Sequence, residues 1–357
     1  MACWSLIDFG IDVIPTWRGN GKQVPSVQTM IEEIVSMQTQ WKELCSAHNS
    51  DNKWKSHLKH VREQFVIDFI HKTSQAEGVG VQGREKLVGF LSNEQKSRKS
   101  NSAQESKIHS KEQLETLNLL NAWQYLWDIV TKCRQEDPFS LGLIDVDECV
   151  KGLNRIVLKG ISLNGRTKGG QFSTEHRVTT YKGEVHEYPF FESEEAAYDA
   201  VLLITDRYNE LVSQIRNLSD SVEKLTLLYK CAAWLLFELV SLHPFSDGNG
   251  RVCRLLCSYC LSVVTPFPTP VHSVFSCQVQ EDYINAIVKA RSSEKRQPVD
   301  LTCLLVESSW TAWKLFIAEL NKTTSQPTEK LVSSCLDQER DSLFRRRSLP
   351  VAICVRT

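Results

Sequence analysis

The chain has 357 residues, of which 41% are hydrophobic and 24% charged, as in an ordinary globular protein. Its formal net charge of −1 excludes a general basic field that would attract nucleic acid or an anionic membrane, so any anion-binding site has to be local. We expect an intracellular protein, cytoplasmic with the nucleus as the alternative, because no signal peptide is recognisable and the longest apolar stretches are about half a membrane span.

Apolar residues at helical spacing dominate the sequence. They predict helices over 26–48, 61–78, 114–133, 140–158, 193–216, 220–242, 251–264, 279–292 and 299–320. The second helix should end at Gly78, because glycine is a common helix terminator. Asp145 or Asp147 lies early in the helix predicted over 140–158. Residues 92–113 are nearly free of apolar side chains, which predicts a mobile loop.

One segment departs from the helical period. Residues 176–190 place β-branched and aromatic residues on both sides of Lys182-Gly183, which predicts a short β-hairpin. The GRTKGG stretch before it, residues 165–170, is typical of a turn. The fold class predicted from these patterns is all-α, a helical bundle that carries one small hairpin.

The stretch HPFSDGNGRVCR, residues 243–254, has an unusual density of functional residue types between two apolar helices. Gly248, Asn249 and Gly250 form a turn that can approach a ligand closely, since two of the three lack a Cβ. The turn opens into a helix, whose first backbone N–H groups and positive dipole end attract an anion. The sequence therefore predicts a phosphate site here.

The charged residues of the same stretch fit this chemistry. Arg251 and Arg254 lie three positions apart on the new helix, and arginine binds phosphate through a two-pronged contact. Asp247 is a candidate ligand for Mg²⁺, which usually bridges carboxylate and phosphate oxygens. His243 can accept a proton near neutral pH and is the candidate general base.

These residues resemble the signature of the Fic family, His-x-Phe-x-(Asp/Glu)-Gly-Asn-Gly-Arg-x-x-Arg, at every defined position. The resemblance implies an α-helical Fic fold and transfer of AMP from ATP to a Ser, Thr or Tyr hydroxyl of a target protein. It assigns His243 as the base and Asp247 as the ligand of Mg²⁺, with Mn²⁺ as an alternative. It further implies that Phe245 is buried and fixes the loop. The residues implied to bind the nucleotide phosphates are Gly248, Asn249, Gly250, Arg251 and Arg254.

The similarity extends to the predicted hairpin, which resembles the flap that docks the target in Fic proteins. Ser173 stands where the family often has arginine, so that contact is not expected here. Residues 281–290 resemble a helix whose Asn or Tyr approaches the adenine. The partners implied are ATP and a target protein docked near 176–190, with a homodimer as a candidate assembly and without nucleic acid or membrane.

A second motif lies upstream. Thr73, Glu77 and Gly78 in KTSQAEGV resemble the inhibitory pattern (Ser/Thr)-x-x-x-Glu-(Gly/Asn) that one class of Fic proteins carries N-terminal to the core. If Glu77 pairs with Arg254, that arginine cannot hold the γ-phosphate, and ATP would bind with its triphosphate misplaced for reaction. The resemblance thus predicts an autoinhibited enzyme.

Four regions are predicted from this interpretation: an N-terminal helical region (1–60), an inhibitory helix with a polar loop and a packing helix (61–135), a Fic catalytic domain (136–320) and a polar tail (321–357). Three alternatives stay open at this point. The same site could remove AMP from a target, could use another donor such as UTP, GTP or CDP-choline, or could bind nucleotide without turnover as a sensor or scaffold.

Overall fold

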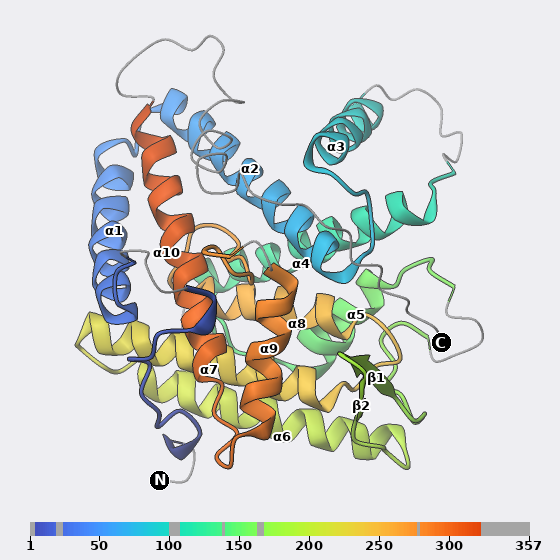
Figure 1. The fold of residues 1–357 in the computed structure, drawn as a ribbon. Helices are drawn as coiled ribbons and strands as arrows, with labels where there is room; N and C mark the ends of the chain where they lie inside the picture. Colours follow the sequence, from blue (N-terminus) through green and yellow to red (C-terminus); the bar gives the residue numbers. More distant parts are fainter. Residues whose placement is uncertain are drawn as a thin grey trace.

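The computed structural model describes residues 4–18, 24–99, 108–137, 140–162, 168–276 and 279–322 (Figure 1). The predicted polar tail lies almost wholly outside these residues, and so do residues 165–167, the first half of the predicted GRTKGG turn. The last described helix, Val299–Asn321, ends where this tail begins.

The described residues form a helical bundle with one hairpin, which confirms the predicted fold class (Figure 1). The helices are α1 (Val27–Ala47), α2 (Asn52–Glu77), α3 (Arg84–Lys99), α4 (Lys111–Glu136), α5 (Gly152–Val157), α6 (Glu194–Ile215), α7 (Ser221–Leu242), α8 (Asn249–Leu261), α9 (Val279–Ser292) and α10 (Val299–Asn321). The hairpin pairs β1 (Val178–Tyr181) with β2 (Glu184–Glu187) in antiparallel register.

Helix α7 is the centre of the core. It packs against α1, α6, α8 and α10, and its apolar residues are nearly all buried. Among the described helices it is the one that is long and apolar enough to cross a membrane by length and composition, but most of that apolar window is buried inside the protein. The helix that follows it, α8, is buried along its whole length, so the motif between them is rooted in the core.

The beginnings of the helices are set by polar caps. Ser110 and Gln113 form a capping box at α4, and the Ser193 hydroxyl accepts from the Ala196 N–H at α6. Asp145 accepts from the Glu148 N–H, so of the two candidate aspartates it is Asp145 that caps. The helix predicted over 140–158 therefore begins later, as a wide turn of π-helix (Val146–Lys151) that leads into α5.

Helix α2 begins at Asn52 rather than at 61. The Asp51 carboxylate accepts from the N–H groups of Lys53 and Trp54, which fixes the first turn. Trp54 and Leu58 then extend the buried face towards the N-terminus. These two apolar residues are embedded among lysines and histidines, so the helical period is weak in the sequence there.

The prediction of a mobile loop over 92–113 is wrong for residues 92–99, which belong to α3, and for residues 111–113, where α4 begins. Residues 100–107 lie outside the described residues. Lysine, glutamate and glutamine favour helix even without a wide apolar face. Leu87 and Leu91 are buried and hold α3 in place, and the buried Glu94 carboxylate lies 3.4 Å from Nε2 of His109. Two leucines and one polar pair thus suffice to order a helix whose composition looks like that of a loop.

Candidate active site

The motif predicted from the sequence forms the connection between α7 and α8. His243 ends α7 in the left-handed region, at φ 50°, which turns its side chain away from the helix direction. Phe245 is buried and its ring lies 5.0 Å from that of Phe172. The Asn249 side chain accepts from the Phe245 N–H at 3.0 Å and donates to the Phe245 carbonyl at 2.7 Å, so it closes the loop. Any part of Asn249 in a phosphate nest would come from its backbone.

The beginning of α8 has the properties of an anion site. Gly248 occupies the position before the helix at φ 80°, and as a glycine it provides no side chain to cap the first N–H groups. Arg251 is 3% exposed, and among the described residues its Nε and Nη1 atoms have no hydrogen-bond partner. Buried guanidinium donors without a partner are costly, and a bound phosphate would satisfy them.

Asp247 lies half-exposed at the edge of this cradle. Its Oδ1 atom accepts from the Gly248 N–H at 2.5 Å and from Nη2 of Arg251 at 2.9 Å. Within the described ranges no group of three or more His, Cys, Asp or Glu side chains could hold a metal alone. A single carboxylate fits Mg²⁺, which keeps several waters and takes most other ligands from phosphates.

Asn154 of α5 positions this loop and was not found from the sequence. It is 1% exposed, and its Nδ2 donates to the Asp247 carbonyl at 2.9 Å. Its Oδ1 accepts from the Gly170 N–H at 2.8 Å, at the entry to the hairpin segment. One side chain therefore joins the loop of the candidate metal ligand to the segment that precedes the hairpin. An asparagine inside an apolar helix has no sequence signal that separates this role from an ordinary buried amide.

Replacing Asn154 with alanine should lower the free energy of unfolding by about 1–3 kcal/mol, because it leaves the Asp247 carbonyl and the Gly170 N–H buried without partners. Denaturant titration followed by circular dichroism measures the change. The matched control is Asn217→Ala. The Asn217 side-chain amide donates to the Ser213 carbonyl at an exposed position, four residues back in the chain. Equal stability of the two variants would contradict the bridging role of Asn154.

The candidate base His243 is half-buried and lies beneath Tyr188, the residue that follows β2. The Tyr188 ring stacks on its imidazole with centroids 3.9 Å apart and planes 16° apart. Burial, and next the positive charges of Arg177 and Arg291, lower the pKa of His243 to about 4, while the Val240 carbonyl and Asp247 act in the opposite direction. The imidazole is therefore neutral at physiological pH, as a proton acceptor must be.

Glu77 reaches this site from the end of α2. Its Oε1 atom pairs with Nη1 of Arg254, whose side chain is 4% exposed. Burial lowers the pKa of Arg254, but the Glu77 carboxylate, together with Tyr283 and Cys253, raises it, and the net shift is upward. A Cβ added to Gly250 would overlap both carboxylate oxygens of Glu77, so the carboxylate lies directly against the beginning of α8. It lies at the helix N-terminus where the sequence predicts a phosphate site.

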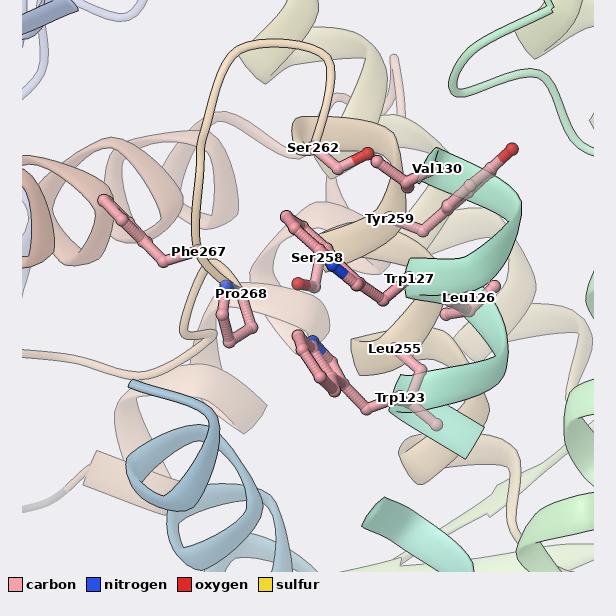
Figure 2. A pocket seen from close by; sticks show the side chains of 10 residues that line it. All are labelled: Trp123, Leu126, Trp127, Val130, Leu255, Ser258, Tyr259, Ser262, Phe267 and Pro268. Carbon is pink, nitrogen blue, oxygen red and sulfur yellow. The ribbon is translucent and has the colours of Figure 1, made fainter. Parts of the chain in front are cut away.

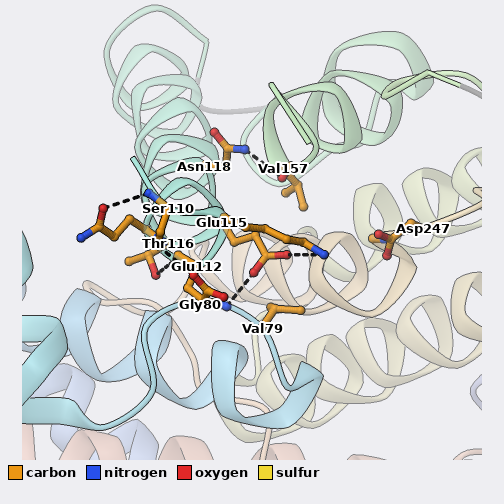
Figure 3. A network of polar contacts seen from close by, with 12 residues as sticks. Val79, Gly80, Ser110, Glu112, Glu115, Thr116, Asn118, Val157 and Asp247 are labelled. Atoms are coloured by element: carbon orange, nitrogen blue, oxygen red, sulfur yellow. Dashed lines mark hydrogen bonds and ion pairs between the residues drawn. The ribbon is translucent and has the colours of Figure 1, made fainter. Parts of the chain in front are cut away.

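The other two residues of the predicted inhibitory motif have structural places. Gly78 caps α2 at φ 64°, a conformation that favours glycine, and Thr73 is buried one turn before Glu77. Beyond the cap, the Gly80 N–H donates to Glu115 at 2.9 Å (Figure 3). The Val81 N–H donates to the Thr116 hydroxyl at the same distance. Helix α4 thus fastens the segment that follows Glu77, which limits where the carboxylate can point.

The hairpin is fastened to α9. The Tyr181 hydroxyl donates to Oδ1 of Asn285 at 2.9 Å, and Nζ of Lys182 lies 2.5 Å from Glu281. These contacts place the hairpin beside the helix predicted to approach a nucleotide base.

The hairpin also contacts the motif loop. The Ser173 N–H donates to the Pro244 carbonyl at 2.8 Å. Ser173 stands where the family often has arginine, but its own carbonyl accepts from Arg177, four residues on. The guanidinium of Arg177 therefore lies beside Ser173, although residue 173 itself is not an arginine.

A small pocket elsewhere is a poor candidate for the site. It lies between α4 and α8 and is lined mainly by aromatic and aliphatic side chains, among them Trp123, Trp127 and Phe267 (Figure 2). Its polar lining consists of Ser258, Ser262 and Tyr259. None of the described residues that line it is charged, so it offers nothing to neutralise phosphates.

Comparison with known proteins supports this interpretation of the motif. The model of the Fic/DOC family matches residues 147–261. A Fido domain-containing protein of Dictyostelium discoideum is 38% identical over 95 residues, which is 26% of this chain and 63% of that protein. A ribonucleoside-diphosphate reductase small chain of Ostreid herpesvirus 1 is 28% identical over 152 residues, 43% of this chain and 24% of that protein. The chain thus spans less than two thirds of both curated relatives.

One solved structure has the same fold over most of the chain. It is that of a Fic domain containing signaling protein from Bacteroides thetaiotaomicron, with a TM-score of 0.57 and 17% identity. The likeness covers 85% of this chain and 99% of that one. It therefore extends well beyond the segment that the family model matches.

Proposed function

Because residues 147–261 belong to the Fic/DOC family, we propose that this protein is a Fic-type transferase that moves AMP from ATP to a hydroxyl of a target protein. The observation that carries the proposal is the convergence at the beginning of α8. A neutral half-buried histidine, a half-exposed carboxylate and two buried arginines surround the N-terminus of a helix that begins at a glycine. These are the parts that nucleotide phosphate transfer requires.

In the proposed reaction His243 accepts the proton of the target hydroxyl. The hydroxyl oxygen forms a bond to the α-phosphorus while the bond from that phosphorus to the bridging oxygen breaks, and pyrophosphate leaves. Arg251 and Arg254 would neutralise the phosphates, with the N–H groups of α8 as further donors. Asp247 would hold Mg²⁺, which would supply charge neutralisation between the phosphate oxygens.

Glu77 would keep this reaction slow. It pairs with Arg254 and lies against Gly250, so one carboxylate occupies both an arginine and the helix N-terminus that the phosphates need. Nucleotide could still enter with its triphosphate displaced from the reactive position. The target would dock along the hairpin, whose Val178 and Val185 side chains are largely exposed.

A mass-shift experiment tests the proposed function. The Glu77→Gly variant is incubated with Mg²⁺ and each of ATP, UTP, GTP and CTP, and the intact mass is measured. We expect a gain equal to one AMP with ATP, and no gain when a chelator removes the metal. A mass gain with another triphosphate would mean that this nucleotide, and not ATP, is the donor. Tight nucleotide binding without any mass gain would favour a sensor. Loss of AMP from a modified protein, without any gain, would favour the reverse reaction.

A further inference from the structure

We propose that Tyr188 is a positioning residue for His243: its ring holds the imidazole in one plane and keeps water from it while the hairpin lies over the site. The inference deepens the proposed function, since it assigns to the hairpin a part in preparing the base in addition to docking a target.

The stack between the two rings carries the inference. With the centroids 3.9 Å apart and the planes 16° apart, the phenol covers one face of the imidazole. His243 is a single residue in the left-handed region between α7 and the loop, so its backbone alone does not determine the ring plane. A ring packed on that face limits rotation about χ2, which is otherwise a broad torsion for histidine.

Tyr188 is itself held from several sides. Its backbone N–H donates to the Arg177 carbonyl at 2.9 Å, just beyond the end of the hairpin ladder. The Arg291 guanidinium lies 5.5 Å from its ring, and His186 meets it edge-on at 4.9 Å. Arg291 also donates to the Ser241 hydroxyl at 3.1 Å, so α9 connects the hairpin to the end of α7. The stack is therefore a three-part contact among hairpin, α9 and motif loop.

The charges around His243 come from every side of the site. Arg177 lies in the hairpin segment, Arg291 in α9, and Asp247 in the motif loop, while Glu77 of α2 acts on Tyr188 itself. The two arginines disfavour an imidazolium and the carboxylate favours it. Tyr188 adds no charge of its own at neutral pH, but its hydroxyl is hydrogen-bonded to Arg291. Phenylalanine removes that bond and keeps the ring, whereas alanine removes both, so the two variants separate the cover that the ring gives the imidazole from the contact with the guanidinium.

The test compares Tyr188→Ala with Tyr188→Phe in the full chain without nucleotide. The titration of His243 is followed by NMR of its imidazole protons, assigned with His243→Ala. We expect a midpoint near pH 4 and an upfield ring shift in the wild type, both retained with phenylalanine. With alanine the upfield shift should be lost and the midpoint should move towards the ordinary histidine value of about 6.5. Val185→Ala, an exposed change in the same hairpin, should alter neither.

An activity arm uses the same changes in the Glu77→Gly background. Tyr188→Ala should lower kcat about tenfold or more with little change in KM for ATP. Tyr188→Phe, which keeps the ring, should have a kcat close to that of the Glu77→Gly background. An unmoved titration midpoint in Tyr188→Ala, or an equal shift in Tyr188→Phe, overturns the inference. If the Glu77→Gly background transfers nothing from any nucleotide, the proposed function fails, while the NMR comparison still decides the role of Tyr188.

Discussion

Replacing Glu77 with glycine is expected to raise the rate of self-modification with labelled ATP by about tenfold or more. The wild-type carboxylate pairs with the buried Arg254 and lies against Gly250 at the beginning of α8. A competitor that stabilises the resting site by about 1.4 kcal/mol already lowers productive occupancy tenfold. A partly buried carboxylate–arginine pair can exceed that value, because the buried arginine would otherwise be left without a counter-charge.

The measurement is incorporation of label from ATP into the purified chain over time, at saturating Mg²⁺. The matched control is Glu63→Gly, which places the same substitution in the same helix at an exposed residue away from the site. It reproduces the cost of a glycine in α2, about 1 kcal/mol, without touching Arg254. Activation by both variants would mean that a less stable α2 is sufficient to raise the rate. Equal rates for wild type and Glu77→Gly would show that Glu77 does not inhibit the enzyme.

Much of this fold could be predicted because the apolar period is strong where the core is continuous. Helices α1, α6, α7, α9 and α10 each bury a clear stripe, and their predicted limits agree closely with the observed ones. The predicted hairpin also agrees, because Lys182 and Gly183 both adopt the positive φ that a tight hairpin turn requires. Helix α3 could not be predicted in this way, because its two buried leucines are too few to give a recognisable helical pattern of apolar residues.

The candidate site divides in the same way. Residues 243–254 could be predicted because their chemistry is contiguous in sequence and their spacing is set by one turn and one helix. The pairing of Glu77 with Arg254 depends on how α2 crosses α8, and residue spacing alone contains no such information; a resemblance suggested it. Asn154, Arg177 and Tyr188 had no signal, because their roles consist of contacts made across the fold.

Replacing His243 with alanine in the Glu77→Gly background should lower the rate of transfer by about 10²–10⁴-fold, the usual contribution of a general base. Nucleotide affinity should change little, because the arginines and the beginning of α8 remain. The labelled-ATP assay gives the rate, and calorimetry with ATP gives the affinity. His176→Ala is the matched control, because His176 is exposed and stacks on Phe190 in the segment around the hairpin.

The pH profile of kcat/KM tests the environment of the same residue. Burial first, and then Arg177, lower the pKa of His243 to about 4, so the imidazole is already neutral and able to accept a proton well below pH 6. Because kcat/KM reports the groups of the free enzyme, its acid limb should lie near pH 4, with no loss of rate from this residue between pH 8 and pH 5.5. An acid limb centred near 6.5 would mean that the base is exposed to water in solution. The closed hairpin over His243 would then describe only part of the population, and the buried stack with Tyr188 could not account for the protonation state in which the residue works.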